Sequence, residues 1–182
     1  MRIYIIKCIT IAHSMMIHVY TGDGKGKTTA AVGLCCRAAG VGKRVLFAQF
    51  LKGRPTGEVA ALESLGVAVW RTGVQKFVPF MTEEERADCK LQQISLFELA
   101  QGVMGQYDVV VLDEIIGAVT LGLIPLESVI ELIKRQPEQT ELILTGRDAP
   151  EELTRLADYV SDIRAVKHPY DAGVPAREGI EY

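Results

Sequence analysis

Short runs of apolar residues alternate along the chain with longer segments of helical periodicity. The apolar runs predict β-strands at residues 17–20, 44–50, 67–70, 107–113, 141–145 and 159–166. The run at 107–113 (YDVVVLD) has an unbroken Val/Leu stretch, which is typical of a strand that is covered on both faces in a parallel sheet.

Helical patterns lie between these runs, at residues 27–39, 57–65, 82–104 and 126–135, and a further helix starts at Pro150. Thr82 and Glu85 have the spacing of a capping box at the start of the longest helix. Regular alternation of strands and helices predicts an α/β fold with a mostly parallel β-sheet flanked by helices. The sequence contains no repeat or linker, so we predict a single domain over residues 15–182.

Residues 1–14 form a predicted N-terminal extension of uncertain structure. The segment is apolar, but Lys7 interrupts it and it is too short to cross a membrane. It fits a signal peptide poorly, because no cleavage site of small residues precedes the first strand. An extra strand, a loose extension and an upstream translation start, with Met15 or Met16 as the usual beginning, all remain open interpretations.

Composition and charge narrow the possible partners. The formal net charge is -3, and no broad basic field is present, which argues against nucleic acid as the main partner. The cysteines (Cys8, Cys35, Cys36 and Cys89) form no C-x-x-C pair, and the histidines (His13, His18 and His168) stand apart from them. We therefore predict reduced thiols, no zinc site and a cytoplasmic protein.

A glycine-rich segment (TGDGKGKTT) connects the first predicted strand to the first predicted helix. Glycines in this position, followed by Gly-Lys-Thr, indicate a P-loop that binds nucleotide phosphates through backbone N–H groups and the positive end of the helix. The predicted phosphate-binding residues are Gly22, Asp23, Gly24, Lys25, Gly26, Lys27, Thr28 and Thr29.

Lys27 and Thr28 carry specific chemistry within this segment. Lys27 supplies a mobile positive charge for phosphate oxygens, and the Thr28 hydroxyl is placed to bind Mg²⁺. Thr21 stands where the strict motif has glycine, so an unrelated glycine-rich turn is the alternative. The Asp23 carboxylate is expected to point away from a bound anion.

Two acidic residues, Asp113 and Glu114, end the most apolar strand. The carboxyl ends of parallel strands share one edge of a sheet, so both acids are expected near the P-loop as ligands of Mg²⁺. A solvated strand end or a helix cap is the alternative.

A P-loop and an acidic strand end predict a bound Mg–nucleotide but do not specify which bond breaks. A phosphotransferase or ATPase would act at the γ-phosphate, with Glu114 activating a hydroxyl or a water molecule. An adenosyltransferase would direct a nucleophile to the 5′ carbon, and a nucleotide sensor would bind without turnover.

Residues 19–31 resemble the P-loop of the ATP-dependent corrinoid adenosyltransferases of the CobA/CobO/BtuR type, in which the leading threonine is usual. Further matching stretches follow in chain order at residues 49–53 (QFLKG), 57–58 (GE), 111–114 (VLDE), 144–147 (LTGR), 166–174 (VKHPYDAGV) and 176–182 (AREGIEY). The resemblance covers the chain from about Met16 to Tyr182.

This resemblance implies a RecA-like P-loop NTPase fold, with ATP and a reduced corrinoid as substrates and Mg²⁺ as cofactor. It implies that the Co(I) centre is the nucleophile, so no cysteine is needed and Cys35 and Cys36 pack in the first helix. Lys27 and Glu114 are the predicted catalytic residues, and Thr28, Asp113 and Glu114 the predicted metal ligands. A homodimer and a flavoprotein reductant are the implied partners, and no membrane is involved.

Relatives carry aromatic residues after a glycine in the region of Gly73, where they help to remove the lower axial cobalt ligand. Phe77 or Phe80 would serve here, or both would simply pack under the following helix. Isolated basic residues within the matching stretches are further candidates for the phosphate or corrinoid surroundings: Lys52, Arg147, Lys167 and His168.

Overall fold

A computed structural model describes residues 16–182, and the predicted extension at residues 1–14 lies outside them. Six strands form one sheet in the order β3-β2-β4-β5-β1-β6, and every neighbouring pair is parallel. The strands are β1 (Ile17–Thr21), β2 (Val45–Gln49), β3 (Ala68–Arg71), β4 (Val109–Asp113), β5 (Glu141–Thr145) and β6 (Tyr159–Asp162). The predicted α/β fold with a parallel sheet is therefore confirmed.

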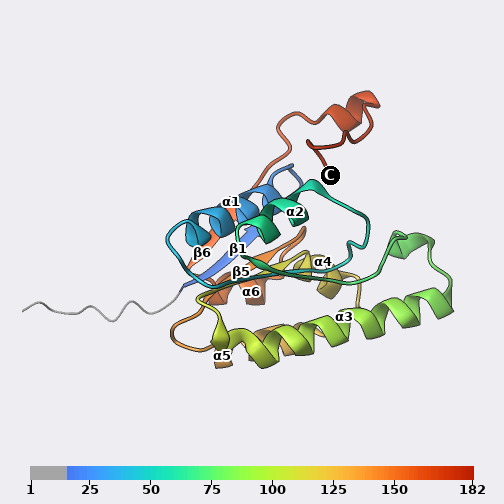
Figure 1. Cartoon of the computed structure of the whole chain (residues 1–182). Helices are drawn as coiled ribbons and strands as arrows, with labels where there is room; N and C mark the ends of the chain where they lie inside the picture. The colour runs from blue at the N-terminus through green and yellow to red at the C-terminus, as the bar shows by residue number, and fades with distance from the viewer. Residues whose placement is uncertain (1–15) are drawn as a thin grey trace, which may run out of the picture.

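Helices cover both faces of this sheet, with α1 and α2 on one side and α3 and α5 on the other (Figure 1). The α-helices are α1 (Lys27–Ala39), α2 (Gly57–Ser64), α3 (Glu83–Val103), α4 (Ile115–Thr120), α5 (Leu126–Arg135) and α6 (Glu151–Leu156). Short 3₁₀ turns occur at η1 (Val78–Phe80), η2 (Met104–Gln106) and η3 (Pro169–Ala172). Within residues 16–182, no helix is both long enough and apolar enough to span a membrane.

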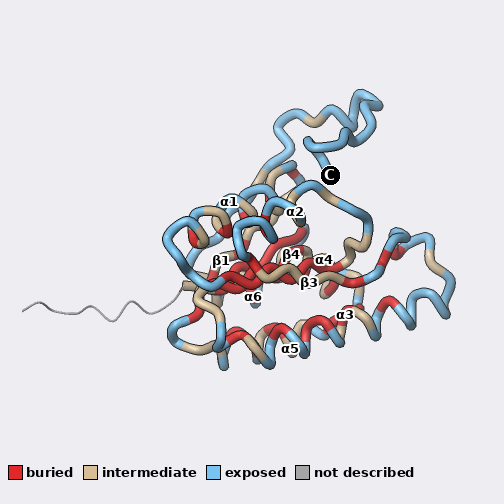
Figure 2. Tube along the Cα trace, viewed as in Figure 1, coloured by how far each residue is buried: buried red, intermediate tan, exposed pale blue. Residues whose placement is uncertain are grey.

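The hydrophobic core has two layers because the central strands are apolar on both faces. Every residue of β2 and β4 is buried (Figure 2). Leu112 on β4 faces a cluster with Phe97 of α3 and Leu132 of α5, whereas Val111 faces a cluster with Cys35 of α1 and Leu62 of α2. Burial of both faces explains why the β4 sequence lacks the alternation of a half-exposed strand.

The strand register places polar residues in a row along the carboxyl edge of the sheet. Gln49 at the end of β2 is paired with Asp113 at the end of β4, and Thr145 at the end of β5 is paired with Tyr20 of β1. The loop that follows β1 leaves the same edge. Ligands of open α/β sheets bind at this edge, so the fold assembles the site from segments far apart in the sequence.

Most predicted elements are present, with differences at their ends. The capping box of α3 is confirmed: the Thr82 hydroxyl accepts from the Glu85 N–H, and the Glu85 carboxylate accepts from the Thr82 N–H. The strand predicted to reach residue 166 ends at Asp162. The chain leaves the sheet there because the Ile163 carbonyl turns to accept a hydrogen bond from Gly24.

Candidate active site

The P-loop encloses the side chain of Lys27, the first residue of α1. Lys27 is buried, and its ammonium donates hydrogen bonds to the carbonyl oxygens of Gly22 (2.5 Å) and Gly24 (2.9 Å). Burial lowers the pKa of Lys27, while the negative charge of Glu114 acts in the opposite direction. The loop thus holds a cation at its centre, at the positive end of a helix of 13 residues.

The glycines of the loop serve two different purposes. A Cβ on Gly22 would lie 2.5 Å from the Ile163 carbonyl oxygen, and a Cβ on Gly24 would lie 2.7 Å from the same atom. The Gly24 N–H already donates to that oxygen at 2.7 Å. Gly26, in contrast, has a φ of 129° and open space where a Cβ would lie. Gly22 and Gly24 therefore let the loop pack against the end of β6, a role that the sequence does not indicate.

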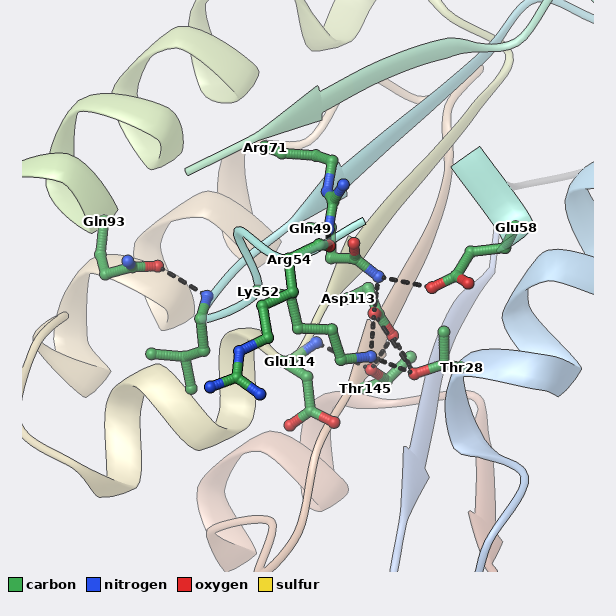
Figure 3. A network of polar contacts seen from close by, with 11 residues as sticks. Thr28, Gln49, Lys52, Arg54, Glu58, Arg71, Gln93, Asp113, Glu114 and Thr145 are labelled. Atoms are coloured by element: carbon green, nitrogen blue, oxygen red, sulfur yellow. Dashed lines mark hydrogen bonds and ion pairs between the residues drawn. The ribbon is translucent and has the colours of Figure 1, made fainter. Parts of the chain in front are cut away.

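Asp113 is the centre of a polar cluster at the end of β4 (Figure 3). Its carboxylate is fully buried and accepts hydrogen bonds from Thr145 Oγ1 (2.7 Å), Thr28 Oγ1 (3.0 Å) and Gln49 Nε2 (3.1 Å). Lys52 Nζ lies 3.3 Å from Asp113 Oδ2 and donates to Thr28 Oγ1 at 3.0 Å. These partners fix the orientation of the carboxylate.

Glu114 adopts a left-handed backbone conformation, with a φ of 62°, and its N–H donates to Thr145 Oγ1 at 2.9 Å. Its carboxylate points away from that of Asp113 (Figure 3). Burial and the neighbouring Asp113 raise the pKa of Glu114, and the charges of Lys52 and Lys27 oppose this increase. The chain thus brings Thr28 and Asp113 into direct contact and directs Glu114 to a separate position.

The donors at this edge suit a hard divalent cation that is shared with phosphate oxygens. The Thr28 hydroxyl and the Asp113 carboxylate are oxygen ligands of the kind that Mg²⁺ prefers. Among residues 16–182, no group of three or more His, Cys, Asp or Glu side chains is placed to hold a metal by itself. Mg²⁺ usually keeps several water ligands and shares substrate phosphates, so two protein oxygen ligands are a suitable set.

The other basic candidates fall into two groups. Lys52 is part of the Asp113 cluster, and the charge of Arg147, in the loop after β5, acts on both Lys27 and Glu114. Lys167 and His168 lie in the exposed tail that follows β6. His168 Nδ1 accepts from the Tyr170 N–H there, a contact within the tail itself.

Of the two interpretations of Phe77 and Phe80, packing of both rings under the following helix is not what the structure shows. Their exposed fractions are 67% and 74%. The Arg54 guanidinium lies over the Phe77 ring, 6.0 Å from its centre, and Arg54 Nε donates to the Gln75 carbonyl. Both rings therefore face outward from a segment that is tied to the loop after β2.

The cysteines of α1 match the predicted packing role. Cys35 is fully buried against the sheet, and burial raises the pKa of its thiol to about 12. Such a thiol is not a nucleophile near neutral pH. Cys36 is partly buried beside it.

Three residues of the cluster lie in the stretches that resemble the family but received no role of their own from the sequence: Gln49, Glu58 and Thr145. Gln49 is fully buried and donates to Glu58 Oε1 (3.0 Å) as well as to Asp113. Gln49 and Thr145 are polar residues that follow apolar residues at the carboxyl ends of their strands, and this signal marks a ligand-binding edge.

A parallel sheet with a lysine-containing glycine loop after β1 and an acidic β4 end defines the class: this chain is a P-loop nucleotide-binding protein. Residues 13–182 match a family model described as ATP:corrinoid adenosyltransferase BtuR/CobO/CobP. The chain therefore belongs to this family, which confirms the resemblance of its motifs.

Similar proteins extend over most of the chain. It is 41% identical over 170 residues to the corrinoid adenosyltransferase of Escherichia coli K12, covering 92% of this chain and 85% of the relative. It is 42% identical to the corrinoid adenosyltransferase CobA of Salmonella typhimurium LT2, with the same coverage of 92% and 85%. A corrinoid adenosyltransferase of Pseudomonas aeruginosa PAO1 is 32% identical, with coverage of 90% and 82%.

Proposed function

We propose that this protein transfers the 5′-deoxyadenosyl group of ATP to the Co(I) centre of a reduced corrinoid and releases triphosphate. The observation that carries the proposal is the family match over residues 13–182, which includes every element of the phosphate site. The reaction belongs to cobalamin metabolism and makes the protein a transferase.

The site residues act mainly on the leaving group. The cobalt electron pair forms the Co–C bond at the 5′ carbon while the C5′–O bond breaks, and its electrons leave with the triphosphate. Lys27 and the N-terminus of α1 bind phosphate oxygens, and Lys52 adds a second ammonium at the same edge. Magnesium, held by Thr28 and Asp113, would further neutralise the triphosphate.

Glu114 has a different part in this scheme. Its carboxylate lies in the field of Lys27, Lys52 and Arg147 but is directed away from Asp113. We place it beside the nucleotide as a fixed negative charge that orients these cations. Its predicted role as a magnesium ligand stays a prediction, and Thr28 and Asp113 are the pair that would hold the metal.

The decisive experiment incubates the protein with ATP, Mg²⁺ and chemically reduced cobalamin, and follows the corrinoid spectrum and the phosphate products together. We expect an alkylated corrinoid and triphosphate in equal amounts. Lys27→Ala should reduce turnover by at least about 100-fold, because it removes the buried ammonium that stabilises the departing triphosphate. Lys43→Ala, at an exposed position after α1, is the matched control.

Two outcomes would contradict this assignment. Release of ADP and phosphate without corrinoid alkylation would identify an enzyme that acts at the γ-phosphate. Unchanged transfer by Lys27→Ala would mean that the P-loop does not hold the triphosphate. A homodimer, a flavoprotein reductant and a cytoplasmic location remain predictions, and light scattering of the purified protein tests the first.

A further inference from the structure

Two adjacent glutamines in the middle of α3 bind the loops that leave two neighbouring strands. Gln93 is fully buried, and its Oε1 accepts from the Leu51 N–H at 3.1 Å, just after β2 (Figure 3). Gln92 Oε1 accepts from the Gly73 N–H at 3.0 Å, just after β3. One helix thus holds both loops at the carboxyl edge of the sheet.

The two loops also pack directly on each other through their backbones. A Cβ on Gly53 would lie 2.5 Å from the Val74 carbonyl oxygen and 2.6 Å from the carbonyl carbon of Gly73. Neither loop can move far at this contact without the other. The side chains of Gln92 and Gln93 therefore fix the loop pair relative to α3.

Leu51 requires such support because its φ is 60°, a left-handed conformation that is uncommon for leucine. A residue held there stores strain, and the surrounding contacts must maintain the conformation. The next residue is Lys52, whose ammonium contacts Thr28 and Asp113. The direction in which Lys52 leaves the loop is thus set at the residue that Gln93 holds.

We propose that Gln93 is a positioning residue: by holding Leu51 in the left-handed conformation, it places the Lys52 ammonium at the triphosphate end of the nucleotide site. The inference rests on the proposed function for the identity of the ligand. Gln93 itself contacts neither Thr28 nor Asp113, and its effect on the nucleotide passes through Lys52. Gln92 performs the equivalent task for the Gly73 loop, which does not carry Lys52.

Gln93 does more than fill space in the core, because burying an amide costs more than burying an apolar side chain of the same size. Its Nε2 has only a weak contact in the structure, with Cys89 Sγ at 3.7 Å. The amide oxygen therefore supplies the specific interaction.

The test measures ATP affinity by calorimetry in the presence of Mg²⁺ and without corrinoid, so that no transfer occurs. Gln93→Met keeps the size of the side chain but lacks the amide oxygen, and it should weaken ATP binding about five- to tenfold. Lys52→Met removes the ammonium and should weaken binding more. Gln101→Met, at an exposed position on the same helix, should leave the affinity unchanged and serves as the control.

A double-mutant cycle separates positioning from general destabilisation. In the Lys52→Met background, Gln93→Met should have almost no further effect on ATP affinity, because its action is transmitted by the missing ammonium. In the otherwise wild-type protein, Gln93→Glu keeps an acceptor for the Leu51 N–H and should bind ATP more tightly than Gln93→Met does. Thermal denaturation of each variant verifies that the protein is folded at the temperature of the assay.

Additive effects of the two substitutions, or full ATP affinity in Gln93→Met, would overturn the inference. These readouts do not depend on adenosyl transfer. If the wild-type protein binds ATP but does not alkylate the corrinoid, the proposed function fails while the coupling between Gln93 and Lys52 is still measured.

Discussion

Thr145 offers a direct test of how the Asp113 cluster is held together. The hydroxyl of this fully buried residue donates to Asp113 Oδ1 at 2.7 Å and accepts from the Glu114 N–H at 2.9 Å. Thr145→Val keeps the shape of the side chain and removes both hydrogen bonds. The Glu114 N–H loses its partner, and Asp113 keeps the donors from Thr28, Gln49 and Lys52.

The expected loss of stability follows from these two contacts. A polar group left without its partner costs about 1–3 kcal/mol, and a lost hydrogen bond to a charged group costs about 1.5–3 kcal/mol. Since Asp113 retains other donors, we take the lower ends and expect Thr145→Val to lower the free energy of unfolding by about 2.5 kcal/mol. For a chain of this size, that corresponds to a decrease in Tm of roughly 5–10 °C.

Urea unfolding followed by circular dichroism measures this loss, and Thr145→Ser is the matched control. Serine keeps the hydroxyl and loses one methyl group, which costs about 1 kcal/mol. The m-value should be the same in all three proteins, because the surface exposed on unfolding hardly changes. If the valine variant is as stable as the serine variant, the hydroxyl does not hold Asp113 and Glu114 in the way described.

Two further substitutions test the loop and the acidic pair. Gly24→Ala should destabilise the protein by about 1–3 kcal/mol, because the new Cβ meets backbone atoms, whereas Gly33→Ala, at an open helical position, should stabilise it by about 0.5–1 kcal/mol. Equal thermal shifts for both would contradict the packing of the loop against β6. The pKa of Glu114 is raised above 4.5, so the folded state loses relative stability as the pH rises from there through the raised pKa. Glu114→Gln should therefore have a higher Tm than the wild type at about pH 8 and the same Tm at about pH 4. A higher Tm of the variant at low pH only would show that the pKa of Glu114 is lowered by folding and not raised.

Elements with strong local signals were predictable from the sequence. The capping box of α3 and the apolar run of β4 follow from patterns of a few neighbouring residues. The helix Ile115–Thr120 was not predicted, because it is short, contains Gly117 and is apolar on more than one face. The length of β6 was also misjudged, since its end is set by a contact between Ile163 and the distant Gly24.

The same distinction applies to the site. The P-loop and the Asp113–Glu114 pair are contiguous motifs, so the sequence located them without knowledge of the fold. The packing role of Gly24 and the contact of Gln93 with Leu51 depend on the order of the strands and on where α3 crosses the sheet edge. A polar residue in the middle of a long helix gives no local indication that it is buried.

The attachment of the P-loop to the end of β6 has a consequence for how the protein tolerates change. All four residues of β6 are exposed, and β6 is an edge strand. The links to the loop are made by main-chain atoms: Ile163 N–H donates to Thr21 and Ile163 C=O accepts from Gly24. The side chains of β6 do not make these links, whereas inserting or deleting one residue there would shift the backbone out of alignment and disconnect the P-loop from the outermost strand.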